Sequence, residues 1–254
     1  MAIVNDIYTF LNEIAPVRYQ MDFDNAGFLV GDGGAAVKKA LLALDITDDV
    51  IAEAVELRAQ LIVSHHPLIF TPLRHATTDD LAGRKVLTLA QYGISAICMH
   101  TNLDAADGGV NDCLAKKLGL NDVFLLNDEK IGRIGTLSCE KGLEEFLRDV
   151  IELLGCGGLR YCRGSGRVHR VAVGGGACSE YIPQAIAQGC DTFVTSDLRY
   201  NDFLDTRGLN LIDAGHFPTE NVVCPTVKAY LEEHFPEVKT VISTSHRDVI
   251  QYYL

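Results

Sequence analysis

The sequence predicts an α/β protein, and three observations support this prediction. Short apolar segments with the length of buried strands alternate with longer amphipathic segments along the whole chain. Hydrophobic residues make up 48% of the sequence and charged residues 22%, a composition typical of globular proteins. Two successive series of segments resemble each other, which fits either two related lobes or a chance similarity. A length of 254 residues permits one large domain or two smaller lobes.

The expected elements follow from apolar spacing and from residues that begin or end helices. The first helix follows Asn5, because apolar residues recur at helical spacing as far as Ile14. After it we expect a strand at 40–45, a helix after Thr47, a strand at 61–64, a helix at 79–92, a strand at 94–99 and a helix at 109–118. The second series comprises a strand at 131–138, a helix ending at Gly155, a strand at 168–173, a helix at 181–188, and strands at 191–195 and 209–213.

Composition and charge limit the function. The formal net charge of -12 would repel a phosphate backbone, so we do not expect nucleic acid to be a partner. Residues 1–16 lack the basic start and apolar block of a secretory signal, and no apolar run reaches the roughly 20 residues of a membrane span. The eight cysteines contain no C-x-x-C pair, so we expect thiols rather than disulfides or a cysteine-bound zinc. These features predict a soluble, cytoplasmic protein.

Histidines and carboxylates follow three of the expected strands. The strand at 61–64 leads into the adjacent pair His65 and His66, the strand at 94–99 into the sequence HTNLD, and the strand at 209–213 into AGHFPTE. In open α/β sheets, ligands bind beyond the carboxyl ends of the strands. A single histidine is more often a structural group than a ligand, but three such strand ends in one chain favour a metal site.

The spacing of these residues suggests how they could bind metal. Pro67 favours an extended conformation at His66, so the two adjacent imidazoles should diverge toward different ions. Pro218 is compatible with the first turn of a helix that begins at His216, which would place Glu220 beside that histidine. We expect Asp104 to lie in a loop, where its carboxylate could bridge two ions.

The candidate ligands are therefore three imidazoles and two carboxylates: His65, His66, Asp104, His216 and Glu220. This set is too large for one catalytic zinc, which usually takes three protein ligands, and it fits two ions a few ångströms apart. Mixed nitrogen and oxygen ligands favour two divalent transition-metal ions, drawn from Zn, Mn, Fe, Co or Ni.

Weaker candidates lie near these strand ends. We expect His100 to support the metal ligands rather than to bind metal itself. Asp197 and Arg199 follow the strand at 191–195, and Arg199 could bind a phosphate or carboxylate or form a surface ion pair. The glycines at 174–176 could cradle an anion at a helix start or form a tight turn. No serine or cysteine has an evident catalytic base, so we assign no catalytic residue.

Four segments give the chain a family resemblance. The sequences DNAGFLVGD, SHHPLIF, HTNLDAADGGVND and LIDAGHFPTE resemble, in order, the signature blocks of the NGG-one-interacting-factor-three-like family, whose members are often called GTP cyclohydrolase 1 type 2 homologues. The resemblance implies a toroidal homohexamer of two-lobed α/β protomers, with a dinuclear metal site in the cleft between the two lobes. It places the five metal ligands on the five residues named above. In that pattern His66 and Asp104 hold one ion, His65 and His216 hold the other, and Glu220 bridges them.

The two lobes implied by the resemblance would span residues 1–125 plus 222–254 and residues 126–221. The chain departs from the family pattern at two positions: Phe23 stands where the first block usually has tryptophan, and Asn201 stands where a later block usually has histidine. The first hypothesis is a metal-dependent hydrolase of a nucleotide or related small molecule, and ring opening of GTP is the version that the family label suggests. A non-enzymatic metal-handling or regulatory protein that acts through partner binding is the alternative.

Overall fold

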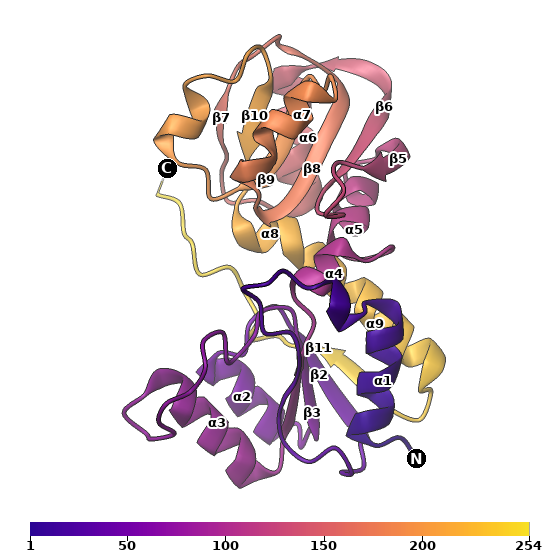
Figure 1. Cartoon of the computed structure of the whole chain (residues 1–254), viewed down its shortest axis with the longest axis vertical. Helices are drawn as coiled ribbons and strands as arrows, with labels where there is room; N and C mark the ends of the chain where they lie inside the picture. Colours follow the sequence, from indigo (N-terminus) through magenta and orange to yellow (C-terminus); the bar gives the residue numbers. More distant parts are fainter. Residues whose placement is uncertain (254) are drawn as a thin grey trace. The chain divides into compact units, whose positions relative to one another are not determined.

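The computed structural model describes residues 1–253, which form two compact units, each with its own sheet (Figure 1). One unit contains Met1–Asp107 and Cys224–Arg247, and the other contains Gly108–Val223 and the residues that follow Arg247. Each sheet carries helices, so the predicted α/β class is confirmed.

The first unit has a five-stranded sheet in the order β1-β4-β3-β2-β11. Its strands are β1 (Gly27–Val30), β2 (Lys39–Ala43), β3 (Leu61–Ser64), β4 (Ser95–Cys98) and β11 (Lys239–Ile242). Its helices are α1 (Val4–Ile14), α2 (Asp48–Glu56), α3 (Leu81–Tyr92), α4 (Thr101–Ala105) and α9 (Cys224–His234), with a 3-10 turn at Val17–Tyr19. All neighbours are parallel except β1, which runs antiparallel to β4.

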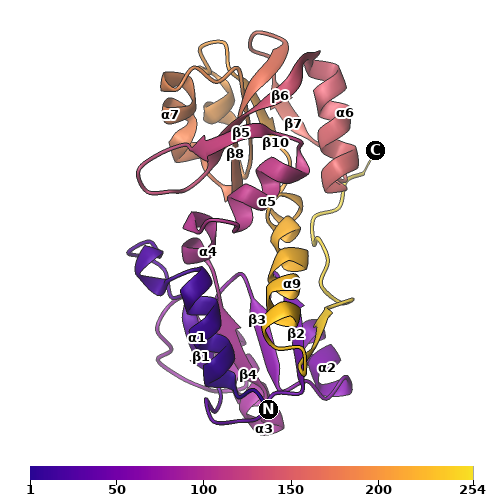
Figure 2. The same ribbon diagram turned by 90° about the vertical axis from the view of Figure 1, so that its right-hand side faces the viewer.

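Helices cover both faces of this first sheet. Figures 1 and 2 show α2 and α3 on one face and α1 and α9 on the other. Every residue of β3 and β4 is buried as a result, which explains why these strands are continuous apolar runs rather than alternating ones. The side chain of Thr47 begins α2 by accepting a hydrogen bond from the Val50 amide.

The second unit has a six-stranded sheet in the order β5-β6-β8-β9-β10-β7. Its strands are β5 (Asn121–Leu125), β6 (Arg133–Gly142), β7 (Arg160–Cys162), β8 (Arg167–Ala177), β9 (Thr192–Ser196) and β10 (Asn210–Asp213). Its helices are α5 (Val110–Lys117), α6 (Leu143–Leu154), α7 (Ile182–Ala187) and α8 (His216–Glu220), with 3-10 turns at Ser179–Tyr181, Tyr200–Phe203 and Asn221–Val223. The strands β8, β9 and β10 are parallel, and the outer strands are antiparallel to their neighbours.

The core of the second unit lies between the sheet and helices α5 and α6. Leu143, Phe146 and Val150 from α6 are buried there against residues of β8, β9 and β10. Figures 1 and 2 show α7 on the opposite face of the sheet from α6. The helix α6 ends, as its sequence predicts, at Gly155 with a left-handed backbone.

Some expectations need revision. Residues 108–125, 222–223 and those that follow Arg247, assigned to the first lobe from sequence, group with the second unit. For the first of these segments the reason is that β5 pairs with β6 and α5 packs against β8. The glycines at 174–176 form neither a turn nor a helix start, because they lie inside β8. Of the strands that lead into candidate ligands, β3 and β4 are neighbours in the first sheet and β10 belongs to the second.

Two expectations from composition have direct structural counterparts. No disulfide links the eight cysteines, as the absence of paired spacing predicted. Within residues 1–253, no helix has both the length and the apolar character needed to span a bilayer.

Candidate metal centre

His65 and His66 leave the carboxyl end of β3 with fixed backbones. Their amides donate to the carbonyl of Leu44 at 3.2 and 2.8 Å, and the Ser64 hydroxyl donates to the His66 carbonyl at 2.9 Å. His65 is only 2% exposed, and its Nδ1 lies 2.8 Å from the carbonyl oxygen of Met99. Because a carbonyl can only accept, Nδ1 carries the proton and Nε2 keeps the lone pair that a metal needs.

Two other imidazoles of the first unit have the same arrangement with carboxylates. His66 Nδ1 lies 2.8 Å from Asp45 Oδ1, and His100 Nδ1 lies 2.7 Å from Asp24 Oδ1. Burial raises the pKa of Asp24, but hydrogen bonds from His100 and Thr101 outweigh burial and lower the pKa to about 2. A carboxylate that accepts from Nδ1 orients the ring and leaves Nε2 available, which is the usual support for a metal-bound histidine.

The three imidazoles form one cluster. The ring centroids of His65 and His66 are 5.0 Å apart, and His100 lies 5.3 and 5.5 Å from them. One ligand nitrogen from each ring lies within 4.8 Å of the others. The predicted divergence of His65 and His66 is therefore not seen. His100, expected to play only a supporting role, presents a ligand atom in the same group.

Asp104 lies in a short helix rather than in the expected loop. His100 stands immediately before α4, and the Asp104 amide donates to the His100 carbonyl at 3.1 Å, so Asp104 lies one turn after the histidine. Its Oδ1 is 3.7 Å from His65 Nε2, close enough for both atoms to bind one ion. Asp104 is 8% exposed, and an ion could compensate the cost of burying its charge.

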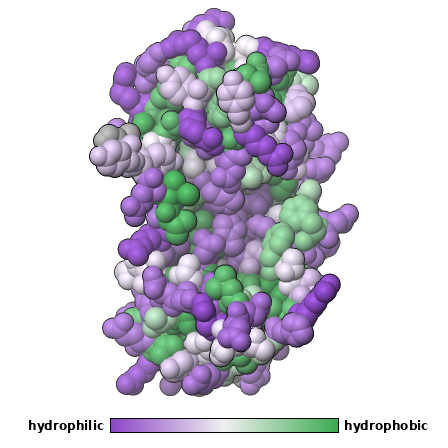
Figure 3. Space-filling model, turned by 90° about the vertical axis from the view of Figure 1, so that its left-hand side faces the viewer, coloured by the Kyte–Doolittle hydropathy of each residue, from purple (hydrophilic) through white to green (hydrophobic). Residues whose placement is uncertain are grey.

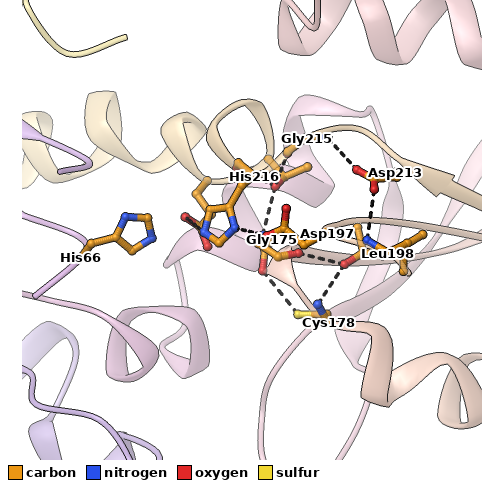
Figure 4. A network of polar contacts seen from close by, with 12 residues as sticks. His66, Gly175, Cys178, Asp197, Leu198, Asp213, Gly215 and His216 are labelled. Carbon is orange, nitrogen blue, oxygen red and sulfur yellow. Dashed lines mark hydrogen bonds and ion pairs between the residues drawn. The ribbon is translucent and has the colours of Figure 1, made fainter. Parts of the chain in front are cut away.

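The second unit carries a histidine and a glutamate on one helical turn. The helix α8 begins at His216 and ends at Glu220, with Pro218 in its first turn, as the sequence predicts. His216 Nε2 lies 3.0 Å from Glu220 Oε2, and His216 Nδ1 lies 2.5 Å from Asp197 Oδ2. Figure 4 shows Asp197 pointing toward the ring of His216. This histidine therefore has the same Nδ1–carboxylate arrangement as His66 and His100.

Charge around His216 shifts two pKa values. Burial lowers the pKa of His216, but hydrogen bonds to Asp197 and Glu220 outweigh burial and raise it to about 10. The hydrogen bond from His216 lowers the pKa of Asp197 in turn. Asp197 has a left-handed backbone, with φ of 54°, a conformation that costs energy in most residues but less in Asp and Asn.

Asp213 at the end of β10 holds the two segments that carry Asp197 and His216. Its Oδ2 accepts from the Leu198 amide and its Oδ1 from the Gly215 amide, each at 3.1 Å, as Figure 4 shows. Leu198 follows Asp197, and Gly215 precedes His216. Asp213 therefore positions this pair, a role that sequence spacing did not reveal.

The carboxylate of Glu220 lies in a space that only glycine leaves open. A Cβ at Gly176 would lie 2.1 Å from Glu220 Oε1 and 3.3 Å from His216 Cε1. The amides of Gly175 and Gly176 already donate to Asn111 and Thr219, so they are not available to an anion. Glu220 is only 3% exposed. Gly176 thus makes room for the glutamate, and the amides of Gly175 and Gly176 do not form an anion site.

The donor chemistry of each unit fits a divalent transition metal. Imidazole nitrogens with oriented Nδ1 groups, together with buried carboxylates, suit Zn and its neighbours. Sequence analysis missed Asp24, Asp45 and Asp213: the first two pair with histidines 76 and 21 positions away, and Asp213 binds the Leu198 amide 15 positions away. Asp45 could have been found, since it follows the strand next to β3. Arg199 is exposed, and its amide donates to Asp202 at 2.7 Å.

Comparison with known proteins places these units in a family. A family model for Duf34/NIF3 (NGG1p interacting factor 3) matches residues 2–249. A Clostridium perfringens protein named GTP cyclohydrolase 1 type 2 homolog is 35% identical over 259 residues, covering 98% of this chain and 99% of that protein. A similarly named protein from Clostridium acetobutylicum is 33% identical, covering 98% of this chain and 97% of that protein.

Solved structures agree with the sequence comparison. A Bacillus cereus protein related to NIF3 superposes with a TM-score of 0.93 at 25% identity, covering 99% of each chain. A Staphylococcus aureus hypothetical protein has a TM-score of 0.92 at 29% identity, again covering 99% of each chain. The chain therefore belongs to the Duf34/NIF3 family.

Proposed function

We propose that the protein is a metal-dependent hydrolase of a nucleotide or related small molecule. Its two divalent transition-metal ions would be held by His65, His66, Asp104, His216 and Glu220. The main support is the shared orientation of the three histidines in this set: each has its Nδ1 directed at an oxygen acceptor, so Nε2 would be the ligand atom. In His216 that Nε2 lies 3.0 Å from Glu220, which is itself a proposed ligand. Structural histidines on a surface need no such common orientation.

The protein's own groups would have distinct tasks in such a centre. Asp45 and Asp197 would orient the rings of His66 and His216 and increase their basicity. His65, whose Nδ1 partner is the Met99 carbonyl, would bind metal through Nε2. His100 would act as a further ligand or as a donor to substrate. Bound ions would supply Lewis acidity and acidify water near neutral pH.

The names of similar proteins suggest a reaction to test first. Proteins named GTP cyclohydrolase 1 type 2 homolog are similar over nearly the whole chain. Hydrolytic opening of the guanine imidazole ring would consume two water molecules and release C8 as formate. A phosphoester would suit the same ligands and would release phosphate. From the family resemblance we also propose a cytoplasmic homohexamer.

The test combines metal content with turnover. Wild type, His66→Ala and a matched control, His169→Ala, would be loaded with each metal and analysed by mass spectrometry. The control changes an exposed histidine on β8. GTP, other nucleotides and simple phosphoesters would then be supplied, and formate and phosphate followed separately.

We expect two ions per chain in wild type and in the control, with product formation lost in His66→Ala. Formate from GTP would identify a cyclohydrolase, and phosphate alone would identify a phosphohydrolase. Two bound ions without either product would overturn the hydrolase assignment and favour a metal-handling or regulatory protein. Fewer than two ions in wild type under all conditions would contradict the centre itself.

A further inference from the structure

Two large aromatic side chains stand exposed beside the histidine cluster of the first unit. Phe23 is 62% exposed and Phe70 is 49% exposed. Their ring centroids are 6.3 Å apart with planes tilted by 44°. Phe70 also makes an edge contact with His100, at 6.2 Å between centroids. The two rings therefore offer accessible aromatic faces close to a candidate metal ligand.

The loops that carry these rings are fixed to the rest of the unit. The Asn25 side-chain amide donates to the Ile69 carbonyl at 2.6 Å, which ties the loop of Phe23 to the loop of Phe70. Asp24, next to Phe23, accepts from Thr101 and pairs with His100. The two loops are thus tied to each other, and that of Phe23 is also tied to His100, so their backbones would lose little conformational entropy on binding.

A pocket adjoins Phe70. Its volume is about 640 Å³, and it is lined mostly by the segment 70–75, together with Leu68, Asp80 and Ala82. A pocket of this size can hold a nucleotide-sized ligand. In the structure of residues 1–253, the Arg74 guanidinium has no ion-pair or hydrogen-bonding partner. Figure 3, which views the side where Figure 1 draws α2 and α3, shows hydrophobic patches within a largely hydrophilic surface.

We propose that Phe23 and Phe70 form an aromatic platform that binds the heteroaromatic ring of an anionic substrate. Arg74 in the adjoining pocket would bind the anionic group of the same molecule. This proposal deepens the hydrolase proposal and names its substrate class, a planar heterocycle with a phosphate or carboxylate. The chemistry recognises ring faces and one negative charge, so the platform distinguishes a purine nucleotide from a sugar phosphate.

The expected energies make the proposal measurable. Stacking of a base on an aromatic side chain contributes about 1–3 kcal/mol, or about 5- to 150-fold in affinity. An exposed ion pair contributes up to about 1 kcal/mol, or about fivefold. The protein has a net charge of -12, which disfavours anion binding in general. Removal of the platform should therefore weaken binding more than removal of Arg74.

The test measures binding rather than turnover. GMP, guanosine and ribose 5-phosphate would be titrated into the full chain by calorimetry, with a chelator present so that metal contributes nothing. The variants would be Phe23→Ala, Phe70→Ala, Phe70→Tyr and Arg74→Ala. Tyr200→Ala is the control, because Tyr200 is a more exposed aromatic residue on the second unit. Thermal unfolding and sedimentation would check that each variant folds and assembles as wild type does.

We expect each alanine change in the platform to lower the affinity for GMP and for guanosine by about 5- to 150-fold. The affinity for ribose 5-phosphate should not change. Phe70→Tyr should keep GMP affinity. Arg74→Ala should lower the affinity for GMP and for ribose 5-phosphate by about fivefold, and it should leave the affinity for guanosine unchanged. Unchanged GMP affinity in both alanine variants would overturn the platform, as would an equal loss in Tyr200→Ala. A changed oligomeric state with unchanged GMP affinity would instead identify the rings as a subunit contact.

The two proposals can fail separately. If the platform variants lose GMP binding and wild type releases neither formate nor phosphate, the platform proposal is supported and the hydrolase proposal is wrong. If Phe23→Ala and Phe70→Ala turn substrate over with an unchanged KM, the hydrolase proposal is supported and the platform proposal is wrong. Metal content, measured on the same samples without chelator, should be equal in wild type and both platform variants.

Discussion

The two units bring their candidate ligands together in different ways. In the first unit, His65, His66 and His100 follow two neighbouring parallel strands, and Ser64 of β3 pairs directly with Cys98 of β4. In the second unit, His216 and Glu220 lie four residues apart on the single turn of α8. The first set therefore depends on the register of a sheet, whereas the second depends on local helix geometry. The comparison teaches that ligands on one helical turn can be recognised from a short stretch of sequence. Ligands that follow neighbouring strands can be recognised only when the order of the strands in the sheet is known.

The strongest test of this comparison concerns the glycine that makes room for Glu220. In Gly176→Ala, the new Cβ would clash with Glu220 Oε1 in a left-handed backbone with φ of 66°. We expect a loss of about 2–4 kcal/mol in unfolding free energy and weaker metal binding. Urea unfolding and metal titration would measure both effects.

Gly189→Ala is the matched control for the glycine variant. Gly189 has φ of 70°, and no atom lies within 4 Å of the position that an added Cβ would take, so this variant carries the backbone cost alone. We expect this variant to lose about 1–2 kcal/mol in unfolding free energy and to keep its metal affinity. Equal effects of the two variants would show that the contact with Glu220 has no importance.

The carboxylates that orient the histidines provide the next test. Asp45→Asn and Asp197→Asn each replace the acceptor of an Nδ1 proton while keeping the size of the side chain. Asparagine also tolerates the left-handed backbone at Asp197. We expect metal affinity to fall by about 10- to 100-fold in each variant. Competition with a metal-sensitive dye would measure the affinity.

The same pair of variants sharpens the comparison between the units. Asp197→Asn should also lower the pKa of His216 from its value of about 10, because a charged hydrogen bond that raises the pKa is lost. Titration of the metal-free protein by NMR would follow that histidine. A large effect of one carboxylate and none of the other would mean that only one unit holds metal.

A carboxylate without an imidazole partner should behave differently. Glu53 in α2 accepts hydrogen bonds from Ser243 and from the amides of Thr244 and Ser245. Burial raises its pKa, but these hydrogen bonds outweigh burial and lower the pKa to about 2. The folded state therefore gains stability above the unfolded pKa of about 4.5 and loses it as pH falls toward about 2.

Glu53→Gln tests this purely structural carboxylate. We expect the variant to lose about 1 kcal/mol at neutral pH, with the gain from charged hydrogen bonds reduced by solvent exposure. The difference from wild type should shrink as pH falls from about 4.5 to about 2. Metal affinity should not change. A changed affinity would contradict a purely structural role and show that Glu53 influences metal binding.

The smallest expected effect concerns the start of α2. Thr47→Ala removes the side chain that accepts from the Val50 amide at 3.2 Å. We expect a loss of about 1 kcal/mol, while Thr47→Ser should retain most of the stability. In the second unit, α6 begins at Gly142 without a side-chain cap and relies on its buried face. Thermal unfolding of both variants would show how much the first unit depends on its cap.

The sequence was sufficient where an interaction is local. The turn at His216, the end of α6 at Gly155 and the alternation of strands and helices all follow from residues within one or two turns of each other. Apolar runs likewise predicted the strands that carry His65 and His100. The α/β class and the helix under His216 could therefore be predicted without a structure.

The remainder depends on contacts between distant residues. The pairs Asp24–His100 and Asp45–His66 join residues 76 and 21 positions apart, so no spacing rule indicates them. Residues 108–125 were assigned to the wrong lobe because the sequence does not show which strands pair: β5 pairs with β6, and α5 packs against β8. The sequence argument for His66 used only Pro67, whereas in the structure its amide donates to the Leu44 carbonyl and its ring pairs with Asp45.

The return of the chain to the first unit has a consequence for biosynthesis. The strand β2 pairs on one side with β11, formed by Lys239–Ile242, which follow the stretch Gly108–Val223 of the second unit in the chain. Until those residues leave the ribosome, β2 presents an open edge of the kind that promotes aggregation. The second unit, built mainly from the continuous stretch Gly108–Val223, has its strands complete earlier. The sheet of the first unit, whose strands β1 to β4 precede those of the second unit in the chain, therefore receives its last strand only after the strands of the second unit have been synthesised.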